Sequence, residues 1–324
     1  MEIISADQVN ALLDYNGLAD ALAEAFSGDI CAPVRHHHTI ERAEGTDSTL
    51  LLMPAWTNFS ETPLTSNGYM GVKIATVSPD NNQIGKPAVM AIYLLSDGTT
   101  GEPLALIDGQ SLTLWRTATA SALAGRYLAP KNAAHLVMIG AGKLAPHLIR
   151  AHAAMHPITR VTLWNRNIEH AHTLAESLSG DAFDVRVSND RAAAIAEADI
   201  VCAATISSKP LIEGSWLKPG THVDLVGAFT PQLRESDDET IRRATLFVDT
   251  FGGALKEGGD IVQPLQSGLI TRSDIVADLA MLCKGEHGGR RDQGEITLFK
   301  STGASIEDFA AGCLVWNRFK ESGR

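Results

Sequence analysis

Short apolar runs alternate with segments of helical spacing from residue 135 onward. The apolar run His135–Ile139 predicts a buried strand, Lys143–His156 predicts a helix, and Arg160–Trp164 predicts the next strand. A strand, a helix and a second strand in this order are typical of a parallel sheet. The pattern continues with predicted strands at 183–187, 199–204, 222–226 and 245–249 and predicted helices at 168–179, 191–198 and 273–284. Six such strands are the usual size of a dinucleotide-binding domain.

The first 110 residues have a different pattern. Asp7–Ser27 has the apolar spacing of one helix, and the segments after it are strand-like and separated by turns. Met90–Leu95 and Leu104–Ile107 are separated by a glycine-containing turn and predict a β-hairpin. Ser111–Leu128 predicts a helix that leads into the parallel domain. This half of the chain is therefore expected to be α+β.

Two domains follow from these patterns. The last predicted helix, residues 305–319, comes after the strand-like segment Ile296–Phe299 and is expected to return to the first domain. We predict an α/β protein with a Rossmann-type, doubly wound parallel sheet in residues 116–299. A discontinuous α+β domain is expected to take residues 1–115 and 300–324.

The composition is that of a soluble globular protein, with 44% hydrophobic and 20% charged residues among 324. The longest uncharged stretch, Ser48–Ser60, contains a proline and is shorter than the roughly 18 residues that a membrane-spanning helix needs. The N-terminal residues carry neither a basic nor an apolar leader segment. We therefore expect no membrane span and a cytoplasmic location.

The net charge is −11 at neutral pH, so the chain lacks the excess of Lys and Arg with which proteins bind a nucleic-acid backbone. No nucleic-acid partner is expected. The cysteines are far apart and form no C-x-x-C pair, which disfavours a zinc ribbon or a redox dithiol. Reduced, buried thiols are expected at Cys31, Cys202, Cys283 and Cys313.

The segment Gly140–Ala145 has the pattern G-x-G-x-x-A, directly after a predicted strand and at the start of a predicted helix. Glycine suits this turn because a side chain would hold the backbone away from a pyrophosphate, which the N–H groups of the helix N-terminus stabilise. The same pattern also occurs as a structural tight turn. In this context it favours dinucleotide binding through Gly140, Ala141 and Gly142.

The end of the second predicted strand bears on the choice of dinucleotide. NAD sites place an acidic residue there for the ribose 2′-hydroxyl, whereas NADP sites place an arginine for the 2′-phosphate. The residues here are Trp164, Asn165, Arg166 and Asn167, and the first carboxylate after them is Glu169. Arg166 therefore indicates NADPH as the preferred cofactor, with NADH also accepted. The alternative is that Arg166 is a solvent-exposed charge at the strand end.

Three basic residues of the first domain lie in otherwise uncharged surroundings. They are Arg35, Lys73 and Arg116. A charged group flanked by apolar residues usually needs a paired anion, and a substrate carboxylate is one candidate. An internal ion pair or a solvated side chain explains any one of them equally well.

The run His36–His38 beside Arg35 raises the question of a metal. Adjacent histidines on a strand point to opposite faces, and no nearby cysteine or carboxylate cluster in the sequence completes a ligand set. No metal is predicted, and these histidines form a polar strand or loop, or contribute one ring to a substrate pocket. The segment Ser305–Asp308 is interpreted as a helix capping box rather than as an acid pair.

Several motifs in the right order resemble the ornithine cyclodeaminase/mu-crystallin family, and the resemblance covers nearly the whole chain. These motifs are Gly71–Lys73, Gly101–Ala105 with Asp108-Gly109, Leu112–Ala118, Ile139–Gly142, Ser301–Gly303 and Ile306–Asp308. The family includes ornithine and lysine cyclodeaminases, some alanine dehydrogenases, and ketimine reductases that act on cyclic imines. The resemblance implies that the first domain binds substrate and joins two chains in a homodimer, and that the second domain binds NAD(P).

The resemblance also implies roles for individual residues. Arg35, Lys73 and Arg116 match the cluster that holds the substrate carboxylate, and Lys73 is the candidate for proton delivery in catalysis. Thr117 matches a residue near the cofactor pyrophosphate, and Ser301 matches one near the nicotinamide. The full set of expected cofactor-binding residues is Thr117, Gly140, Ala141, Gly142, Asn165, Arg166, Thr205, Val226 and Ser301.

One departure from the family's cyclodeaminase pattern bears on the reaction. Cyclodeaminases carry a catalytic Asp after the strand that matches Val223–Gly227, and this chain has Phe229 there, which cannot transfer a proton. The leading hypothesis is NAD(P)H-dependent reduction of a cyclic ketimine carboxylate, Δ1-pyrroline-2-carboxylate or Δ1-piperideine-2-carboxylate, to L-proline or L-pipecolate. The alternatives are an ornithine cyclodeaminase and a non-catalytic NADPH or small-ligand binder of the mu-crystallin type.

Overall fold

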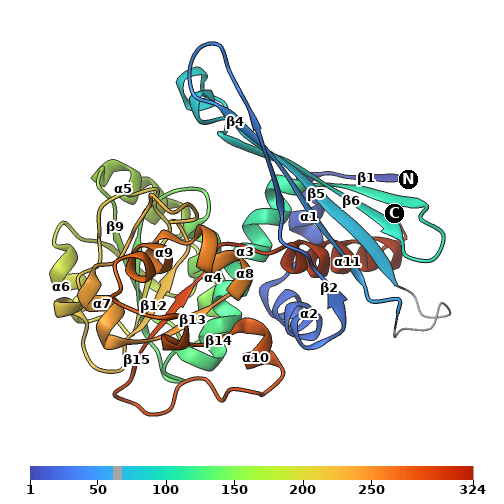
Figure 1. Ribbon diagram of the computed structural model, residues 1–324. Coiled ribbons are helices and arrows are strands. Elements are labelled where there is room, and N and C mark those ends of the chain that lie inside the picture. The colour runs from blue at the N-terminus through green and yellow to red at the C-terminus, as the bar shows by residue number, and fades with distance from the viewer. Residues whose placement is uncertain (61–67, 324) are drawn as a thin grey trace. The chain divides into compact units, whose positions relative to one another are not determined.

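The computed structural model describes residues 1–60 and 68–323, and the chain forms two compact units (Figure 1). The first unit is Met1–Arg116 with Ala304–Arg324, and the second is Thr117–Gly303. The chain passes from one unit to the other within helix α3 (Gly109–Leu128) and again after Gly303. The predicted α/β class is confirmed, with a mixed sheet in the first unit and a parallel sheet in the second.

The sheet of the first unit is mostly antiparallel. Within residues 1–60 and 68–116 the strand order is β1-β7-β6-β5-β4-β2, with β3 also paired to β4, and β1 runs parallel to β7. The strands are β1 (Glu2–Ile4), β2 (Ile30–Cys31), β3 (His36–Ile40), β4 (Ser48–Thr57), β5 (Tyr69–Val77), β6 (Val89–Asp97) and β7 (Pro103–Asp108). The antiparallel pair β6–β7 confirms the predicted hairpin.

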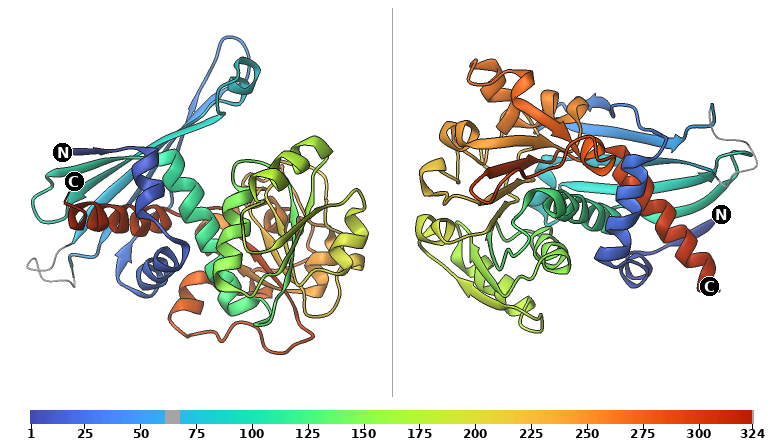
Figure 2. Two further views of the ribbon diagram at one scale, coloured as in Figure 1. Left: turned by 180° about the vertical axis from the view of Figure 1, so that it is seen from behind. Right: turned by 90° about the horizontal axis from the view of Figure 1, so that it is seen from below.

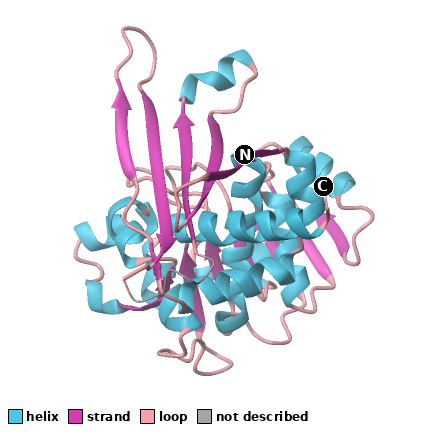
Figure 3. Cartoon of the chain, turned by 90° about the vertical axis from the view of Figure 1, so that its right-hand side faces the viewer, coloured by secondary structure: helices cyan, strands magenta, loops and turns pink. Residues whose placement is uncertain are grey.

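Helices α1 (Ala6–Leu12) and α11 (Ser305–Glu321) pack on this sheet, and α2 (Tyr15–Ser27) packs on α11. Figure 2 shows α11 beside α2, and Figure 3 shows the short helix η1 (Pro79–Ile84) at the turn between β5 and β6. The periodicity of α2 puts Leu18, Leu22 and Phe26 on one buried stripe. Burial of each such side chain contributes about 1.5–3 kcal/mol, so this stripe fixes α2 to the unit.

The prediction of one helix over Asp7–Ser27 is wrong, because the chain leaves helical geometry at Leu13 and Asp14. The Asp14 carboxylate accepts a hydrogen bond from the Gly17 N–H at 2.8 Å and so caps α2. Arg318 of α11 binds the same carboxylate at 2.8 Å. A cap and a tertiary contact therefore override the continuous apolar spacing.

The second unit has eight parallel strands in the order β10-β9-β8-β11-β12-β15-β13-β14. They are β8 (His135–Ile139), β9 (Arg160–Trp164), β10 (Asp184–Val187), β11 (Ile200–Ala203), β12 (His222–Leu225), β13 (Ala244–Val248), β14 (Ile275–Asp278) and β15 (Ile296–Lys300). The six strands predicted between residues 135 and 249 are confirmed. The strand order reverses between β8 and β11, which is the point where such sheets bind their ligands.

Helices lie on both faces of this sheet (Figure 2). They are α4 (Ala145–Met155), α5 (Ile168–Ser177), α6 (Arg191–Ala196), α7 (Asp238–Arg243), α8 (Phe251–Glu257), α9 (Gly259–Gln266) and α10 (Leu279–Cys283), with the short helices η2 (Gly214–Trp216) and η3 (Arg272–Asp274). The core on one face packs Val223 and Leu225 of β12 with Ile195 of α6. Because side chains alternate along a strand, Asp224 points to the other face, where it contacts α3 and α4.

Two predictions for the second unit need correction. Ser273–Lys284 is not one helix, because Ile275–Asp278 pairs with β13 as the edge strand β14 and Leu279–Cys283 alone is α-helical. Pairing with the sheet outweighs the local helical spacing. The sheet has eight strands rather than six, because β14 joins its edge and β15 inserts between β12 and β13.

All four cysteines are free thiols, as predicted, but only Cys202 is fully buried; Cys31, Cys283 and Cys313 are partly exposed. Burial raises the pKa of the Cys202 thiol, which is therefore protonated and a poor nucleophile.

Within the described part of the chain, no helix has both the length and the apolar character that a membrane crossing requires.

Candidate functional site

The turn after β8 has the geometry of a phosphate-binding loop. Gly140 has a φ of 107°, which favours glycine, and a Cβ there would lie 3.0 Å from the Ala204 carbonyl oxygen. Apart from its chain neighbours, no described atom lies within 4 Å of a Cβ built on Gly142, so the backbone is open to a ligand. Helix α4 follows, and its N-cap residue Leu144 makes no side-chain capping bond. Ala145 already donates to the Gly142 carbonyl oxygen at 3.0 Å, and proline at position 146 has no N–H. The candidate donors to an anion are therefore the N–H groups of residues 142–144, just before α4.

The end of β9 carries the residues expected at the adenosine ribose. Trp164 packs on the core of the unit, and Arg166 is exposed. The Asn165 side-chain amide donates to the Asn167 carbonyl oxygen at 2.7 Å, and the Asn167 side chain caps α5 by accepting the Glu169 N–H at 3.1 Å. The strand end thus presents an exposed guanidinium and no carboxylate, which suits a 2′-phosphate.

The carboxyl ends of β8, β11, β12 and β15 meet at one edge of the sheet, and Thr205, Val226 and Ser301 follow three of these strands. The Ser301 N–H donates to the Leu225 carbonyl oxygen at 3.0 Å. Its hydroxyl is buried and has no hydrogen-bond partner among the described residues. Burial of a hydroxyl without a hydrogen-bond partner lowers the free energy of unfolding by about 1–3 kcal/mol, and a bound ligand that supplies the partner removes this penalty. These features fit a bound dinucleotide.

Thr117 lies in α3 as the first residue of the second unit, and it is buried. It shares this unit with the glycine turn and with the residues that follow β11, β12 and β15. Arg35, Lys73 and Arg116 all belong to the first unit. The residues predicted to bind cofactor and those predicted to bind substrate are therefore divided between the two units.

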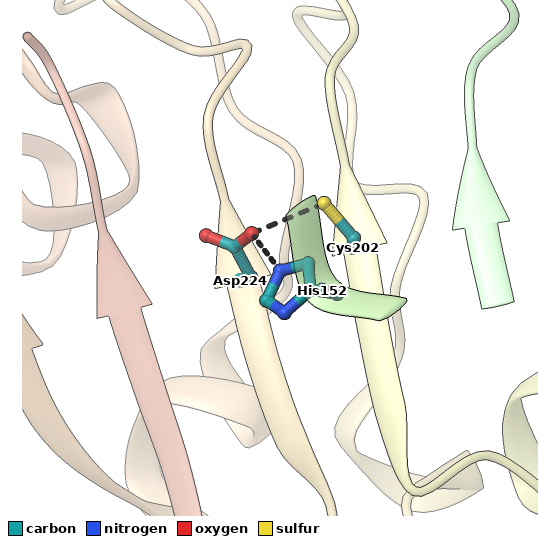
Figure 4. Close-up of side chains that lie close together, drawn as sticks. All are labelled: His152, Cys202 and Asp224. Carbon is teal, nitrogen blue, oxygen red and sulfur yellow. Dashed lines mark hydrogen bonds and ion pairs between the residues drawn. The ribbon is translucent and has the colours of Figure 1, made fainter. Parts of the chain in front are cut away.

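A group of titratable side chains also lies inside the second unit: His152, Cys202 and Asp224 (Figure 4). His152 Nε2 lies 3.1 Å from Asp224 Oδ2, and the Cys202 thiol donates to the same oxygen at 3.1 Å. Ser121 of α3 donates to Oδ1 at 3.0 Å. Burial opposes ionisation of Asp224, but hydrogen bonds from His152 and Cys202 lower its pKa. The group could hold a metal by its ligand types, but its members bind one another in a hydrogen-bond network that ties α3 and α4 to the sheet. In this network His152 Nδ1 has no partner among the described residues.

The first unit contains a buried cluster of opposite charges. Lys73 of β5 and Arg116 of α3 bind the same oxygen of Asp308 in α11, with Nζ at 2.9 Å and Nε at 3.0 Å from Oδ1. Arg116 Nη1 also donates to Glu307 Oε2 at 2.6 Å. No side chain of this charge cluster is more than 6% exposed. An ion pair at this depth is strongly destabilised when one partner is removed.

The sheet positions Lys73 on its helix-covered face. Its neighbours across the strands are Met53 of β4 and Tyr93 of β6, which are both buried. Glycines make room for the tyrosine ring: a Cβ on Gly71 would lie 2.0 Å from the Tyr93 hydroxyl, and one on Gly312 would lie 2.4 Å from the ring. Burial raises the pKa of Tyr93 well above its usual value. Its hydroxyl has no partner within the described residues and is a second polar atom that a ligand could satisfy.

Arg35, just before β3, is a third cation that acts electrostatically on Lys73. It is only partly buried and is not one of the four buried side chains, in which Lys73 and Arg116 pair with Asp308 and Glu307. Burial, together with the charges of Arg116 and Arg35, lowers the pKa of Lys73 to about 8 in spite of Asp308. Lys73 can therefore give up a proton near neutral pH.

The interpretation of Ser305–Asp308 as a capping box rather than an acid pair is wrong. Glu307 does accept the N–H of the N-cap residue Ala304 at 3.2 Å, but Ala304 has no side-chain oxygen to complete the box. Both acids bind the cations of the charge cluster. They were missed because their partners lie some 190 to 235 positions away in sequence. The signal that could have found them was the presence of isolated basic residues that each need an anion.

The three histidines beside Arg35 open β3, and all residues of this strand are exposed. The rings of His36 and His38 lie 6.5 Å apart. Among the described residues they take part in no group of three potential metal ligands. The polar-strand interpretation of this segment therefore describes it best.

Comparison with known proteins adds to this geometry. A family model described as the ornithine cyclodeaminase/mu-crystallin family matches residues 2–323. The Δ1-pyrroline-2-carboxylate reductase of Colwellia psychrerythraea is 38% identical over 316 residues, covering 96% of this chain and 97% of that protein. The structure of the Thermococcus litoralis Δ1-pyrroline-2-carboxylate reductase with NADH and L-proline matches with a TM-score of 0.92 at 32% identity, covering 100% of this chain and 98% of that one. An archaeal alanine dehydrogenase dimer with bound NAD matches with a TM-score of 0.89 at 28% identity, covering 100% and 97%.

Proposed function

The chain belongs to the ornithine cyclodeaminase/mu-crystallin family, and on that premise we propose that it is an oxidoreductase that reduces the C=N bond of a cyclic ketimine carboxylate with a nicotinamide dinucleotide. The substrate is Δ1-pyrroline-2-carboxylate, with Δ1-piperideine-2-carboxylate as the six-membered alternative, and the product is L-proline or L-pipecolate. The observation that carries this proposal is the charge cluster, in which Lys73 and Arg116 share Asp308 and Arg35 acts electrostatically on Lys73.

The charge cluster supports two tasks in this reaction. Arg35 and Arg116 bind and orient the single carboxylate of the substrate, because guanidinium groups match its two oxygens. Lys73 has a pKa of about 8 and supplies the proton that the imine nitrogen gains. The reduced nicotinamide, when bound, supplies the hydride that the imine carbon gains. One proton and one hydride balance the reduction to the cyclic amino acid.

The cofactor is proposed to bind the second unit. Gly140, Ala141 and Gly142 with the start of α4 would hold the pyrophosphate, supported by the open backbone at Gly142. Thr117, Thr205 and Val226 join this site, and the orphaned hydroxyl of Ser301 would bind the nicotinamide end.

We also propose a preference for NADPH over NADH. The end of β9 offers the exposed Arg166 next to Asn165 and no carboxylate. A guanidinium attracts the 2′-phosphate, whereas an acid would repel it. NADH, which lacks this phosphate, remains usable because the contacts to the pyrophosphate are common to both cofactors.

Phe229 favours reduction over the cyclodeaminase alternative. It lies in the segment after β12 and is 40% exposed, so its ring is presented at the surface of the second unit. A phenyl ring can neither donate nor accept a proton. The water attack or amine cyclisation of a cyclodeaminase needs an acid-base group at this place.

A homodimer is proposed to form through the first unit. On the sheet face opposite to Lys73, the side chains of Met90 and Ile92, two residues apart on β6, are 37% and 43% exposed. Neighbouring exposed apolar side chains on one sheet face are typical of an interaction surface. Sedimentation velocity tests the proposal: a dimer is expected for the wild type, and Ile92→Asp with Met90→Lys should yield monomers.

The test of the reaction is to follow oxidation of NADPH and NADH by absorbance with each cyclic imine as substrate. Parallel assays supply ornithine, with ammonia release as the readout, and pyruvate with ammonia. Rapid oxidation with the imines and slow or no reaction in the other assays is expected. Ammonia release from ornithine would favour the cyclodeaminase, and pyruvate reduction would favour an alanine dehydrogenase. Cofactor binding without any turnover would favour a binding protein.

A further inference from the structure

One buried carboxylate, that of Glu235, ties together the segments that follow β11 and β12. Glu235 is fully buried. Its Oε1 accepts the Thr205 N–H at 2.6 Å and the Thr205 hydroxyl at 2.9 Å. Its Oε2 accepts the N–H groups of Gly227 at 2.8 Å and Ala228 at 3.2 Å. Each oxygen therefore serves a different segment.

These two segments are in close contact with each other, and the Thr205 segment also contacts the glycine turn at Gly140. A Cβ on Gly227 would lie 2.0 Å from the Thr205 carbonyl oxygen, so only glycine fits there. The Thr205 methyl group lies 3.1 Å from the position of a Cβ on Gly140. A movement of either segment is therefore transmitted to the edge of the sheet where the dinucleotide is proposed to bind.

Two buried charged residues, Asp260 and Lys300, support the backbone at Glu235. Asp260 of α9 accepts the backbone N–H of Glu235 at 2.9 Å and that of Ser236 at 2.8 Å. Lys300 of β15 lies 3.6 Å from Asp260 Oδ2 and donates to the Leu225 carbonyl oxygen at 3.2 Å. Asp260 and Lys300 are fully buried. The backbone that carries the Glu235 side chain is thus fixed by buried groups of the same unit.

We infer that Glu235 is a positioning residue for the cofactor, which holds the Thr205 and Gly227–Ala228 segments in the arrangement that receives the nicotinamide half of the dinucleotide. The inference rests on the proposed function, because that proposal brings the cofactor to Thr205 and Val226. It assigns Glu235 no contact with the cofactor. Its role is to act through the two segments that it connects.

The chemistry of the four donors makes Glu235→Gln an informative variant. Three of them are backbone N–H groups, which cannot accept a hydrogen bond. A carboxamide offers one acceptor oxygen and one donor group, so it can serve one segment but must oppose the other. We expect the Kd for NAD⁺ to rise about tenfold and kcat to fall, because a displaced nicotinamide is poorly aligned. The Kd for AMP should change less than about twofold, because the adenosine half is held by Gly140–Gly142 and the end of β9.

Glu295→Gln is the matched control. Glu295 is a buried glutamate of the same unit that accepts the Arg291 N–H and the Thr245 hydroxyl, both at 2.6 Å. It precedes β15 and so lies at the opposite, amino end of the strands. We expect this variant to lose stability but to keep the Kd values for NAD⁺ and AMP within about twofold of wild type.

The wild-type pH profile gives a readout that a purely structural role would not move. Burial and the neighbouring Asp260 raise the pKa of Glu235 to about 6, against the opposing effect of Lys300. The other titratable group facing it, the Cys202 thiol, stays protonated because burial raises its pKa. The carboxylate that connects both segments is therefore present above pH 6 and lost below it. We expect NAD⁺ affinity to fall about tenfold between about pH 7 and pH 5, and the profile of Glu235→Gln to be flat.

Calorimetric titration of NAD⁺ and AMP into wild type and both variants tests the inference. An NAD⁺ affinity of Glu235→Gln equal to that of wild type would overturn it, and so would equal losses for NAD⁺ and AMP. If Glu235→Gln does not fold, the pH titration of wild type decides, and a profile in which NAD⁺ and AMP fall together overturns the inference. These titrations need no imine. A wild type that binds NAD⁺ as described but reduces no imine would contradict the proposed function alone.

Discussion

The glycine turn of the second unit and the charge cluster of the first unit are built in opposite ways. The turn is contiguous in sequence and offers the backbone N–H groups of residues 142–144 just before α4, with glycines that keep side chains away. The charge cluster is assembled by side chains from β5, α3 and α11, which are far apart in sequence and meet only in the fold. Only a change to proline removes a backbone donor, whereas many substitutions remove a member of the charge cluster.

This difference has an energetic consequence. At Gly142 in the turn, a substitution changes the access of a ligand to the backbone and leaves the fold of the sheet intact, because apart from chain neighbours a Cβ there meets no described atom within 4 Å. In the charge cluster, each side chain neutralises the charge of another at a depth that water does not reach. The fold and the site therefore depend on the same contacts. Substitutions in the first unit should therefore have larger effects than those at the cofactor site.

The largest effect is expected for Asp308→Asn. The amide cannot neutralise Lys73 and Arg116, which stay buried at 3% and 5% exposure. Breaking a buried pair by removing one partner costs about 3–5 kcal/mol, so the free energy of unfolding in urea should fall by that amount. Imine reduction should be lost as well.

Asp14→Asn is the control for Asp308→Asn. Asp14 also binds an arginine of α11, Arg318, at 2.8 Å, but its side chain is 58% exposed. An exposed ion pair contributes about 0–1 kcal/mol, and Asn keeps the helix cap. Equal losses in the two variants would contradict the view that burial makes the charge cluster special.

The next effect concerns Arg116→Lys, which keeps the charge but loses the planar fork. Arg116 binds Glu307 through Nη1 and Asp308 through Nε, and an ammonium cannot keep both contacts and still orient a carboxylate. A displacement of the imine by about 1 Å can cost on the order of a hundredfold in rate. We expect kcat/KM to fall about a hundredfold, with NADPH affinity unchanged in a fluorescence titration.

Arg290→Lys provides the comparison for Arg116→Lys. Arg290 is a partly buried arginine of the second unit that donates to the Leu128 carbonyl oxygen at 2.7 Å. This substitution should lower stability and leave kcat/KM close to the wild-type value. Near-normal turnover of Arg116→Lys, or a loss of NADPH binding with it, would show that Arg116 has another role.

The same contrast explains how much could be predicted from the sequence. The glycine turn and the six strands around it follow from local patterns, because a buried parallel strand is an apolar run and the turn is a motif. The cations of the charge cluster were recognised as unusual in their apolar surroundings. Their acids, Glu307 and Asp308, were assigned to a local helix cap, because nothing near them in sequence indicates partners on β5 and α3.

The two errors in the second unit have a related cause. The segment of β14 has helical spacing on its own and becomes a strand only because β13 offers an edge to pair with. The central position of β15, between β12 and β13, likewise depends on the whole sheet. Glu235 gave no local signal either, since its four donors come from segments that only the fold brings together.

A smaller effect is expected at the cofactor site, where Arg166→Asp tests the preference for NADPH. The change removes a charge-assisted contact to the 2′-phosphate and adds repulsion, so NADPH affinity should fall about tenfold or more. NADH affinity should change less. Arg186→Asp, at an exposed position of β10, makes the same change in net charge and should affect both cofactors by less than about twofold. Equal losses of NADPH and NADH in Arg166→Asp, or a wild type that prefers NADH, would contradict the assignment.

The smallest effect is the pH dependence of the wild-type reaction, which follows from the pKa of Lys73 and is measured without a substitution. Burial and the charges of Arg116 and Arg35 lower this pKa to about 8, while Asp308 opposes the shift. The ammonium form, which gives the proton and helps to neutralise the substrate carboxylate, is present below pH 8 and lost above it. We expect kcat/KM to fall about tenfold between about pH 7 and pH 9.

Lys73→Arg separates this cause from titration of the substrate itself. A guanidinium stays charged across the whole range, so the variant should be slower than wild type but lose the step near pH 8. If the imine rather than Lys73 were the titrating group, the step would persist at the same pH in both proteins. A step that persists would assign proton delivery to water or to the substrate, and the charge cluster would then serve only to hold the carboxylate.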